Sequence, residues 1–144
     1  MAFKFKTPRG KKIDAKPRGD FQFAKEEEEI GLIQGQQPGS QLEYRISKGL
    51  DMLKLDYRYQ YSIGGGRLFR GGYVIDFLVY THPLPTPVEA LGDYWHGGTK
   101  DDVSYRFARI KNMMGGSARE PEAIWEHEAR TITDAYKTLK RKLR

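Results

Sequence analysis

Apolar residues recur at helical spacing in two segments of the chain. In the first, Ser40 followed three residues later by Glu43 is the capping-box pattern that predicts a helix N-terminus. The apolar stripe that accompanies it consists of Leu42, Ile46, Leu50 and Leu53. A second stripe closes the chain with Ala129, Ile132, Tyr136, Leu139 and Leu143. Because residues three or four apart share one face of an α-helix, an amphipathic helix is expected in each segment.

The middle of the chain follows a shorter period. Aromatic and polar residues alternate over 57–61, which is typical of a half-buried β-strand. Short apolar runs at 73–80 and 88–91 predict two further strands, joined by a proline-rich connection. A helix is expected over about 100–112 and another strand over 122–125. The order helix, strands, helix, strand, helix predicts an α/β fold in which a small central mixed β-sheet is flanked by helices.

Composition narrows the classes of protein to consider. The 144 residues suffice for one domain, and 38% hydrophobic against 31% charged residues predicts a modest core under a highly charged surface. A formal net charge of +6 favours a polyanionic partner. The absence of cysteine excludes disulfides and thiolate zinc sites. No apolar run approaches the ~20 residues that cross a bilayer, so we expect a soluble protein with no membrane partner.

The first 38 residues differ from the remainder of the chain in their charge and in their content of proline and glycine. The first 20 contain seven lysines and arginines against two aspartates, interspersed with prolines and glycines. Such a stretch cannot bury an apolar face and predicts a basic, partly disordered arm, which would lie along phosphates if the partner is a nucleic acid. An acidic run at Glu26–Glu29 follows as a linker or the start of a solvated helix. We therefore expect the folded domain to span residues 39–144.

Two acidic residues lie in unusually apolar surroundings. Asp76 is enclosed by Val74, Ile75, Phe77 and Leu78, and Glu89 follows thirteen residues later in the next expected strand. A buried carboxylate needs a partner or a cation. If the two strands pair side by side, both acids project from one sheet edge and suit Mg²⁺, which takes one or two carboxylates, waters and phosphate oxygens. The alternative is that each acid lies at a strand end and faces solvent.

Several short motifs together resemble a known family. A glycine-rich turn, the stretch Val-Ile-Asp-Phe at 74–77, a proline-rich connector and the stretch Val-Glu-Ala-Leu-Gly-Asp-Tyr-Trp-His at 88–96 are similar to the core of PD-(D/E)XK nucleases. The nearest branch is that of the very-short-patch mismatch-repair endonucleases. The resemblance covers roughly residues 40–140.

The resemblance implies a restriction-endonuclease-like fold and a Mg²⁺-dependent endodeoxyribonuclease that hydrolyses DNA phosphodiester bonds. It implies Asp76 and Glu89 as metal ligands, with Glu43 from the upstream helix and His96 completing the catalytic set. DNA, double-stranded in this reading, would be the partner, for a homodimer or larger assembly. The expected compartment is the cytoplasm of a bacterial or phage-infected cell, or a virion.

The chain departs from the family pattern at Leu91, where a lysine normally stands two residues after the acid. In the family that lysine helps to orient the attacking water, and His96 is expected to take over general acid–base work here. The chain also lacks the zinc ligands of the classical mismatch enzymes. A second hypothesis is therefore a non-catalytic nucleic-acid-binding or structural protein, a virion protein included, that reuses the nuclease fold.

Basic residues outside the arm are candidate phosphate contacts. They are Arg67, Arg70, Arg106, Arg109 and Lys111. Tyr94 and Trp95 are interpreted as packing residues, and His82 and His127 receive no role because they lack ligand-like spacing.

Overall fold

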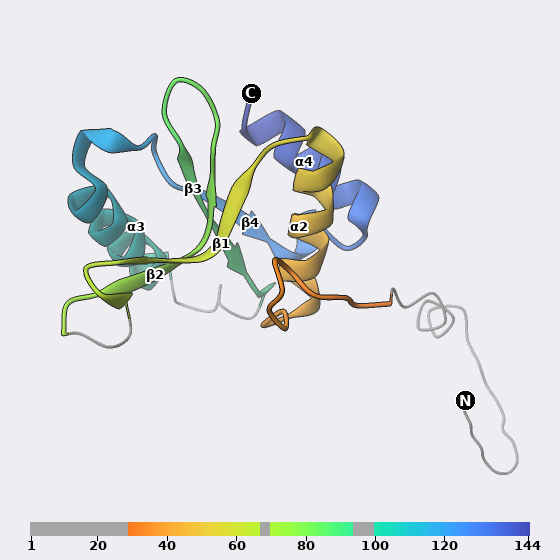
Figure 1. Cartoon of the computed structure of the whole chain (residues 1–144), viewed down its shortest axis with the longest axis horizontal. Coiled ribbons are helices and arrows are strands. Elements are labelled where there is room, and N and C mark those ends of the chain that lie inside the picture. The colour runs from red at the N-terminus through yellow and green to blue at the C-terminus, as the bar shows by residue number, and fades with distance from the viewer. Residues whose placement is uncertain (1–28, 67–69, 94–99) are drawn as a thin grey trace, which may run out of the picture. The chain divides into compact units, whose positions relative to one another are not determined.

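The computed structural model describes residues 29–66, 70–93 and 100–144, and Figure 1 shows its elements. In chain order they are helix α2 (Gln41–Leu53), strands β1 (Tyr57–Ile63), β2 (Tyr73–Val79) and β3 (Thr86–Leu91), helix α3 (Lys100–Met114), the short helix η4 (Gly115–Ser117), strand β4 (Glu122–Trp125), the short helix η5 (Glu126–Glu128) and helix α4 (Ile132–Lys142). Each helix and strand expected from the periodicity is present, with ends that differ by a few residues. None of the helices in these described ranges is both long and apolar enough to cross a membrane.

The four strands form one mixed sheet in the order β1-β2-β3-β4. The first three are antiparallel to their neighbours, and β4 runs parallel to β3. Helices α2 and α4 lie on one face of the sheet and α3 lies on the other (Figure 1). This arrangement confirms the expected α/β fold with a small mixed sheet flanked by helices.

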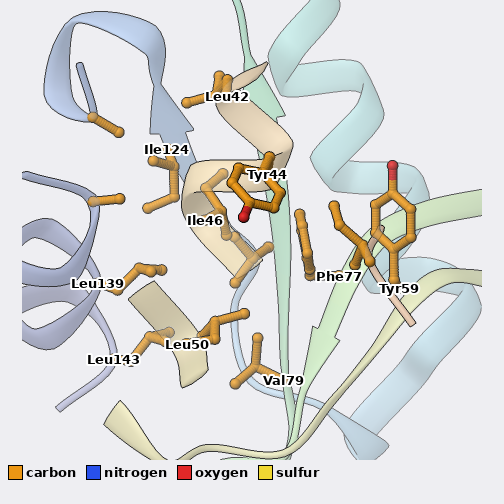
Figure 2. Close-up of a cluster of buried hydrophobic side chains, with 14 residues drawn as sticks. Leu42, Tyr44, Ile46, Leu50, Tyr59, Phe77, Val79, Ile124, Leu139 and Leu143 are labelled. Atoms are coloured by element: carbon orange, nitrogen blue, oxygen red, sulfur yellow. The ribbon is translucent and has the colours of Figure 1, made fainter. Parts of the chain in front are cut away.

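The main hydrophobic core lies between the sheet and the layer formed by α2 and α4. Phe77 and Val79 of β2 point toward the two helices, because alternate side chains of a strand share one face. Figure 2 shows the helical side of this core, where the labelled residues are Leu42, Tyr44, Ile46, Leu50, Leu139 and Leu143. Burial of each large apolar side chain stabilises the fold by about 1.5–3 kcal/mol. The predicted apolar stripes are thus the core faces of α2 and α4.

The compact unit that carries every described element begins at Gly31, whereas the sequence placed the start of the domain at residue 39. Ile33 is 1% exposed and belongs to the main core. The side chain of Gln34 accepts from the Tyr59 N–H at 2.9 Å and donates to the Tyr57 carbonyl at 2.5 Å. The residues before α2 therefore cover part of the outer edge of β1.

Helices α2 and α4 pack closely at Gly49, a position that the apolar periodicity does not single out. A Cβ atom at residue 49 would lie 3.1 Å from the Tyr136 backbone nitrogen and 2.9 Å from Leu139 Cδ1. Both distances are shorter than ordinary van der Waals contact, and the α4 backbone cannot move aside without disturbing its packing. The lack of a side chain at Gly49 therefore sets how closely the two helices approach.

Substitution Gly49→Ala should destabilise the protein by about 1–3 kcal/mol, because overpacking at the helix contact outweighs the better helix propensity of alanine. The midpoint of urea unfolding measures the effect. The matched control is Gly116→Ala, since a Cβ atom there meets no atom within 4 Å. A Gly49→Ala protein as stable as the wild type would show that the helices have room to separate.

Candidate acidic site

The two acids predicted as a pair lie opposite one another where strands β2 and β3 stop pairing. The last paired residues are Phe77 and Val88, so the antiparallel register places Asp76 across from Glu89. At this point hydrogen bonds from backbone N–H groups to side-chain carboxylates take the place of the backbone–backbone hydrogen bonds between β2 and β3. The Asp76 N–H donates to Glu89 Oε2 at 3.1 Å, and the Ala90 N–H donates to Asp76 Oδ2 at 2.9 Å. Both carboxylates are thus fixed to backbone groups of the neighbouring strand.

Glu89 is fully buried and receives its counter-charge from α3. Its Oε1 atom accepts from Arg106 Nη2 at 2.5 Å and from the Tyr73 hydroxyl at 3.2 Å. Arg106 Nε donates in turn to the Tyr73 hydroxyl at 2.9 Å. A buried carboxylate needs such a partner, because its transfer out of water is otherwise prohibitive. The sequence offered Arg106 as a phosphate contact, whereas in the structure it is the ion-pair partner of Glu89.

The acid pair is short of positive charge even with Arg106 present. Burial raises the pKa of Asp76 to about 8, and the negative charge of Glu89 adds to the rise. Burial also raises the pKa of Glu89, although Arg106 and the hydrogen bonds from Asp76 and Tyr73 oppose that rise. At neutral pH the pair therefore favours holding a proton or a further cation.

Glu43 lies in the first turn of α2, whose N-cap is Ser40, as the capping pattern predicted. The Ser40 hydroxyl accepts from the Glu43 N–H at 3.1 Å. The Glu43 carboxylate accepts from the Tyr59 hydroxyl, and the Tyr59 hydroxyl accepts from the Gly39 N–H at 3.1 Å. Burial raises the pKa of Tyr59 to about 12, and Glu43 contributes to the rise. The negative charge of Glu43 also contributes to the raised pKa of Asp76, after burial and the charge of Glu89.

A cleft of about 310 Å³ is lined in part by Glu43, and neither Asp76 nor Glu89 lines it. It lies between the first turns of α2, the end of β3 and η5. The residues that line it are Ser40, Gln41, Leu42, Glu43, Arg45, Ala90, Gly92 and Glu126. Ala90 lines the cleft, and its backbone N–H donates a hydrogen bond to Asp76. Across the ranges the structure describes, no group of three or more His, Cys, Asp or Glu side chains is arranged as a complete metal site.

The other predicted site residues fall into two groups. His96, Tyr94, Trp95 and Arg67 lie outside the described residues. Arg70 is exposed, and Lys111 forms an exposed ion pair with Glu120 at 3.0 Å. Arg109 donates to the Gly71 carbonyl at 2.9 Å and lies over the Tyr73 ring, 5.5 Å from its centroid. Arg106 and Arg109 therefore both fasten α3 to the start of β2.

One polar cluster near the cleft was not anticipated. Asp93 accepts from the His127 backbone N–H at 3.0 Å, and its Oδ1 atom lies 2.8 Å from His127 Nδ1. The Asp93 N–H donates to Glu126 Oε1 at 3.1 Å. The hydrogen bond from His127 lowers the pKa of Asp93. Because β3 and β4 are parallel, the residues that follow them meet at one edge of the sheet, a proximity that no local pattern reveals.

The stability of the wild type relative to Asp76→Asn should fall as the pH rises. The folded state holds a proton on Asp76 up to about pH 8, whereas an unfolded aspartate releases it near pH 4. Since the folded state binds more protons on Asp76 across this window, raising the pH should destabilise the wild type more than the variant, by about 2–4 kcal/mol between pH 5 and 8. Urea unfolding at pH 5, 6.5 and 8 in metal-free buffer measures the difference.

The control for this experiment is Asp51→Asn, because the Asp51 side chain is 54% exposed. Its stability difference from the wild type should stay constant over the same range. A constant difference for Asp76→Asn as well would contradict the raised pKa.

Comparisons of the chain with protein-family models, with curated proteins and with solved structures found no match.

Proposed function

We propose that the chain is a Mg²⁺-dependent endodeoxyribonuclease of the PD-(D/E)XK type whose metal ligands are Asp76 and Glu89. The observation that carries the proposal is the placement of two acids side by side where strands β2 and β3 stop pairing. The mixed sheet flanked by helices agrees with the fold that the resemblance implies. The upstream helix that should contribute a glutamate is α2, with Glu43 in its first turn.

The acid pair fits a divalent cation. Mg²⁺ binds one or two carboxylates and completes its shell with water and substrate oxygens, so a third protein ligand is not required. The raised pKa of Asp76 supports the assignment, because a cation would relieve the repulsion between Asp76 and Glu89. A bound Mg²⁺ would lower the pKa of a coordinated water and neutralise charge on the phosphate.

The protein's own groups would orient the reacting atoms. Glu43 lines the cleft and is held in place by the Tyr59 hydroxyl, so its carboxylate is positioned before substrate arrives. The Ala90 N–H fixes one oxygen of Asp76. His96 remains our proposed general acid–base group, since imidazole titrates near neutral pH.

DNA would bind through its phosphates. The net charge of +6 favours a polyanion. Among the described residues, α4 and the chain end present exposed cations along one helical stripe: Lys137, Lys140, Arg141 and Arg144. The apolar face of the same helix is buried in the core, so the face left exposed is mainly polar and charged. Arg70 and Lys111 would add contacts elsewhere.

A non-catalytic nucleic-acid-binding or structural role is the second candidate, and two observations favour it. Glu89 is already neutralised by Arg106, and Leu91, which occupies the position of the family's lysine, is 1% exposed. A protein in which Arg106 permanently occupies Glu89 would keep the fold of a nuclease but would not bind the metal that hydrolysis requires. The basic stripe of α4 serves either function equally.

Wild-type protein should nick or linearise supercoiled plasmid in the presence of Mg²⁺. Asp76→Asn should lower the cleavage rate by about 100-fold or more, since losing even a group that only hydrogen-bonds to a metal ligand changes activity by about 10–100-fold. Gel analysis of plasmid cleavage measures the rates, and Asp51→Asn should cut at the wild-type rate. Equal cleavage by Asp76→Asn would refute the site. DNA binding without any wild-type cleavage across varied substrates would favour the second candidate.

Neutralising the α4 stripe should weaken DNA binding at low salt. The triple variant Lys137→Gln, Lys140→Gln, Arg141→Gln should reduce the slope of log K against log salt by about 2–3, because each lost phosphate contact contributes about 0.9. Fluorescence anisotropy with a duplex oligonucleotide measures the slope. The matched control neutralises Lys48, Lys54 and Arg58, which removes the same charge from the α2–β1 side. An equal effect in both variants would point to net charge alone.

A further inference from the structure

The guanidinium of Arg106 lies against the Glu89 carboxylate and supplies the positive charge beside it. It contacts Glu89 Oε1 at 2.5 Å, while the Tyr73 hydroxyl holds its Nε atom at 2.9 Å. Among the described residues, a further donor to the Glu89 carboxylate is the Asp76 N–H, which binds Oε2 at 3.1 Å. Glu89 thus carries a positive partner and several hydrogen bonds before any ion arrives.

Such a contact has a direct consequence for metal binding. A divalent ion on Glu89 and a guanidinium on the same carboxylate repel one another strongly in a buried environment, where the effective dielectric constant is low. The ion would gain little from a carboxylate whose charge is already balanced. Binding at Glu89 therefore requires the guanidinium to withdraw, at least in part.

The surroundings of Arg106 allow that withdrawal without loss of the helix. The Arg106 side chain is 27% exposed, whereas Glu89 is fully buried, so the guanidinium borders solvent and the carboxylate does not. Helix α3 has other attachments to the sheet region, because Arg109 binds the Gly71 carbonyl at 2.9 Å and Ile110 is fully buried. A change in the Arg106 side chain can therefore occur while α3 stays in place.

We propose that Arg106 is the counter-ion of the acid pair when no metal is bound, and that a divalent cation binds Asp76 and Glu89 only in competition with it. A substrate phosphodiester binds the guanidinium of Arg106 and thereby allows the cation to bind the two acids. The proposal rests on the proposed function, since it concerns the same acids. Phosphate suits the second step because guanidinium binds it in a two-point geometry. By linkage, the nucleic acid and the metal ion then raise each other's affinity by the same factor. The protein would load its metal when substrate is present.

Mn²⁺ is a suitable probe, because its binding is measured by calorimetry without any cleavage. In the absence of nucleic acid, Arg106→Gln should bind Mn²⁺ about 10- to 100-fold more tightly than the wild type, within the usual range of coupling between sites. Arg106→Lys keeps the charge and should stay near the wild type. Arg109→Gln is the matched control, because it removes a neighbouring guanidinium from α3 that does not contact Glu89. Equal or weaker Mn²⁺ binding by folded Arg106→Gln would overturn the competition.

Loss of Arg106 leaves Glu89 without its partner, so the variant's folding is measured as well by circular dichroism. If Arg106→Gln is unfolded in metal-free buffer, millimolar Mn²⁺ should restore the fold, since the ion takes over the charge of the guanidinium. A variant that remains unfolded with Mn²⁺ would overturn the proposal, because the ion would then be unable to replace Arg106.

The wild type supplies the test of the second step. Its Mn²⁺ affinity should rise when a duplex with non-hydrolysable phosphate linkages is added, and that rise should be absent in Arg106→Gln. An unchanged Mn²⁺ affinity would overturn the role of the phosphodiester. Failure of the proposed function gives a different result: no Mn²⁺ binding by any variant, or binding that Asp76→Asn leaves intact, would refute the metal centre itself and the competition with it.

Discussion

The neutralisation of one buried carboxylate is the constraint on which the acidic site depends. Glu89 is fully buried on the central strand β3, and Arg106 of α3 supplies the charge that makes this burial tolerable. Tyr73 completes the arrangement, because its hydroxyl bonds to both members of the ion pair. The contact therefore joins three elements, and it is one of the attachments of α3 to its face of the sheet.

The opposite face of the sheet is organised by apolar packing. Helices α2 and α4 meet closely at Gly49 and cover Phe77 and Val79 with their apolar stripes. This layer holds the first turn of α2, and with it Glu43, beside the end of β3. The cleft and the acid pair thus depend on two different kinds of interaction, hydrophobic burial on one face of the sheet and a buried ion pair on the other.

The two candidate functions differ in what they require of that ion pair. For a nuclease, Arg106 must yield Glu89 to a metal ion, and the raised pKa of Asp76 is the sign of a pair that lacks positive charge. For a binding or structural protein, the ion pair would attach α3 to the sheet at all times, and the protein would not hydrolyse DNA. The basic stripe of α4 would suit either function, since phosphate contact by exposed cations requires no catalysis.

The sequence alone determined the elements of this protein and the residue types of its site. Helical periodicity defines α2 and α4, a capping pattern marks the start of α2, and short apolar or alternating runs define strands, because these signals depend only on near neighbours in the chain. An acid within an apolar run likewise marked Asp76. Tertiary structure decided which groups meet: Arg106 with Glu89, Asp93 with His127, and α4 with Gly49. Those contacts join residues far apart in the chain, so no local pattern encodes them, and they settle whether a charge faces solvent or a buried partner.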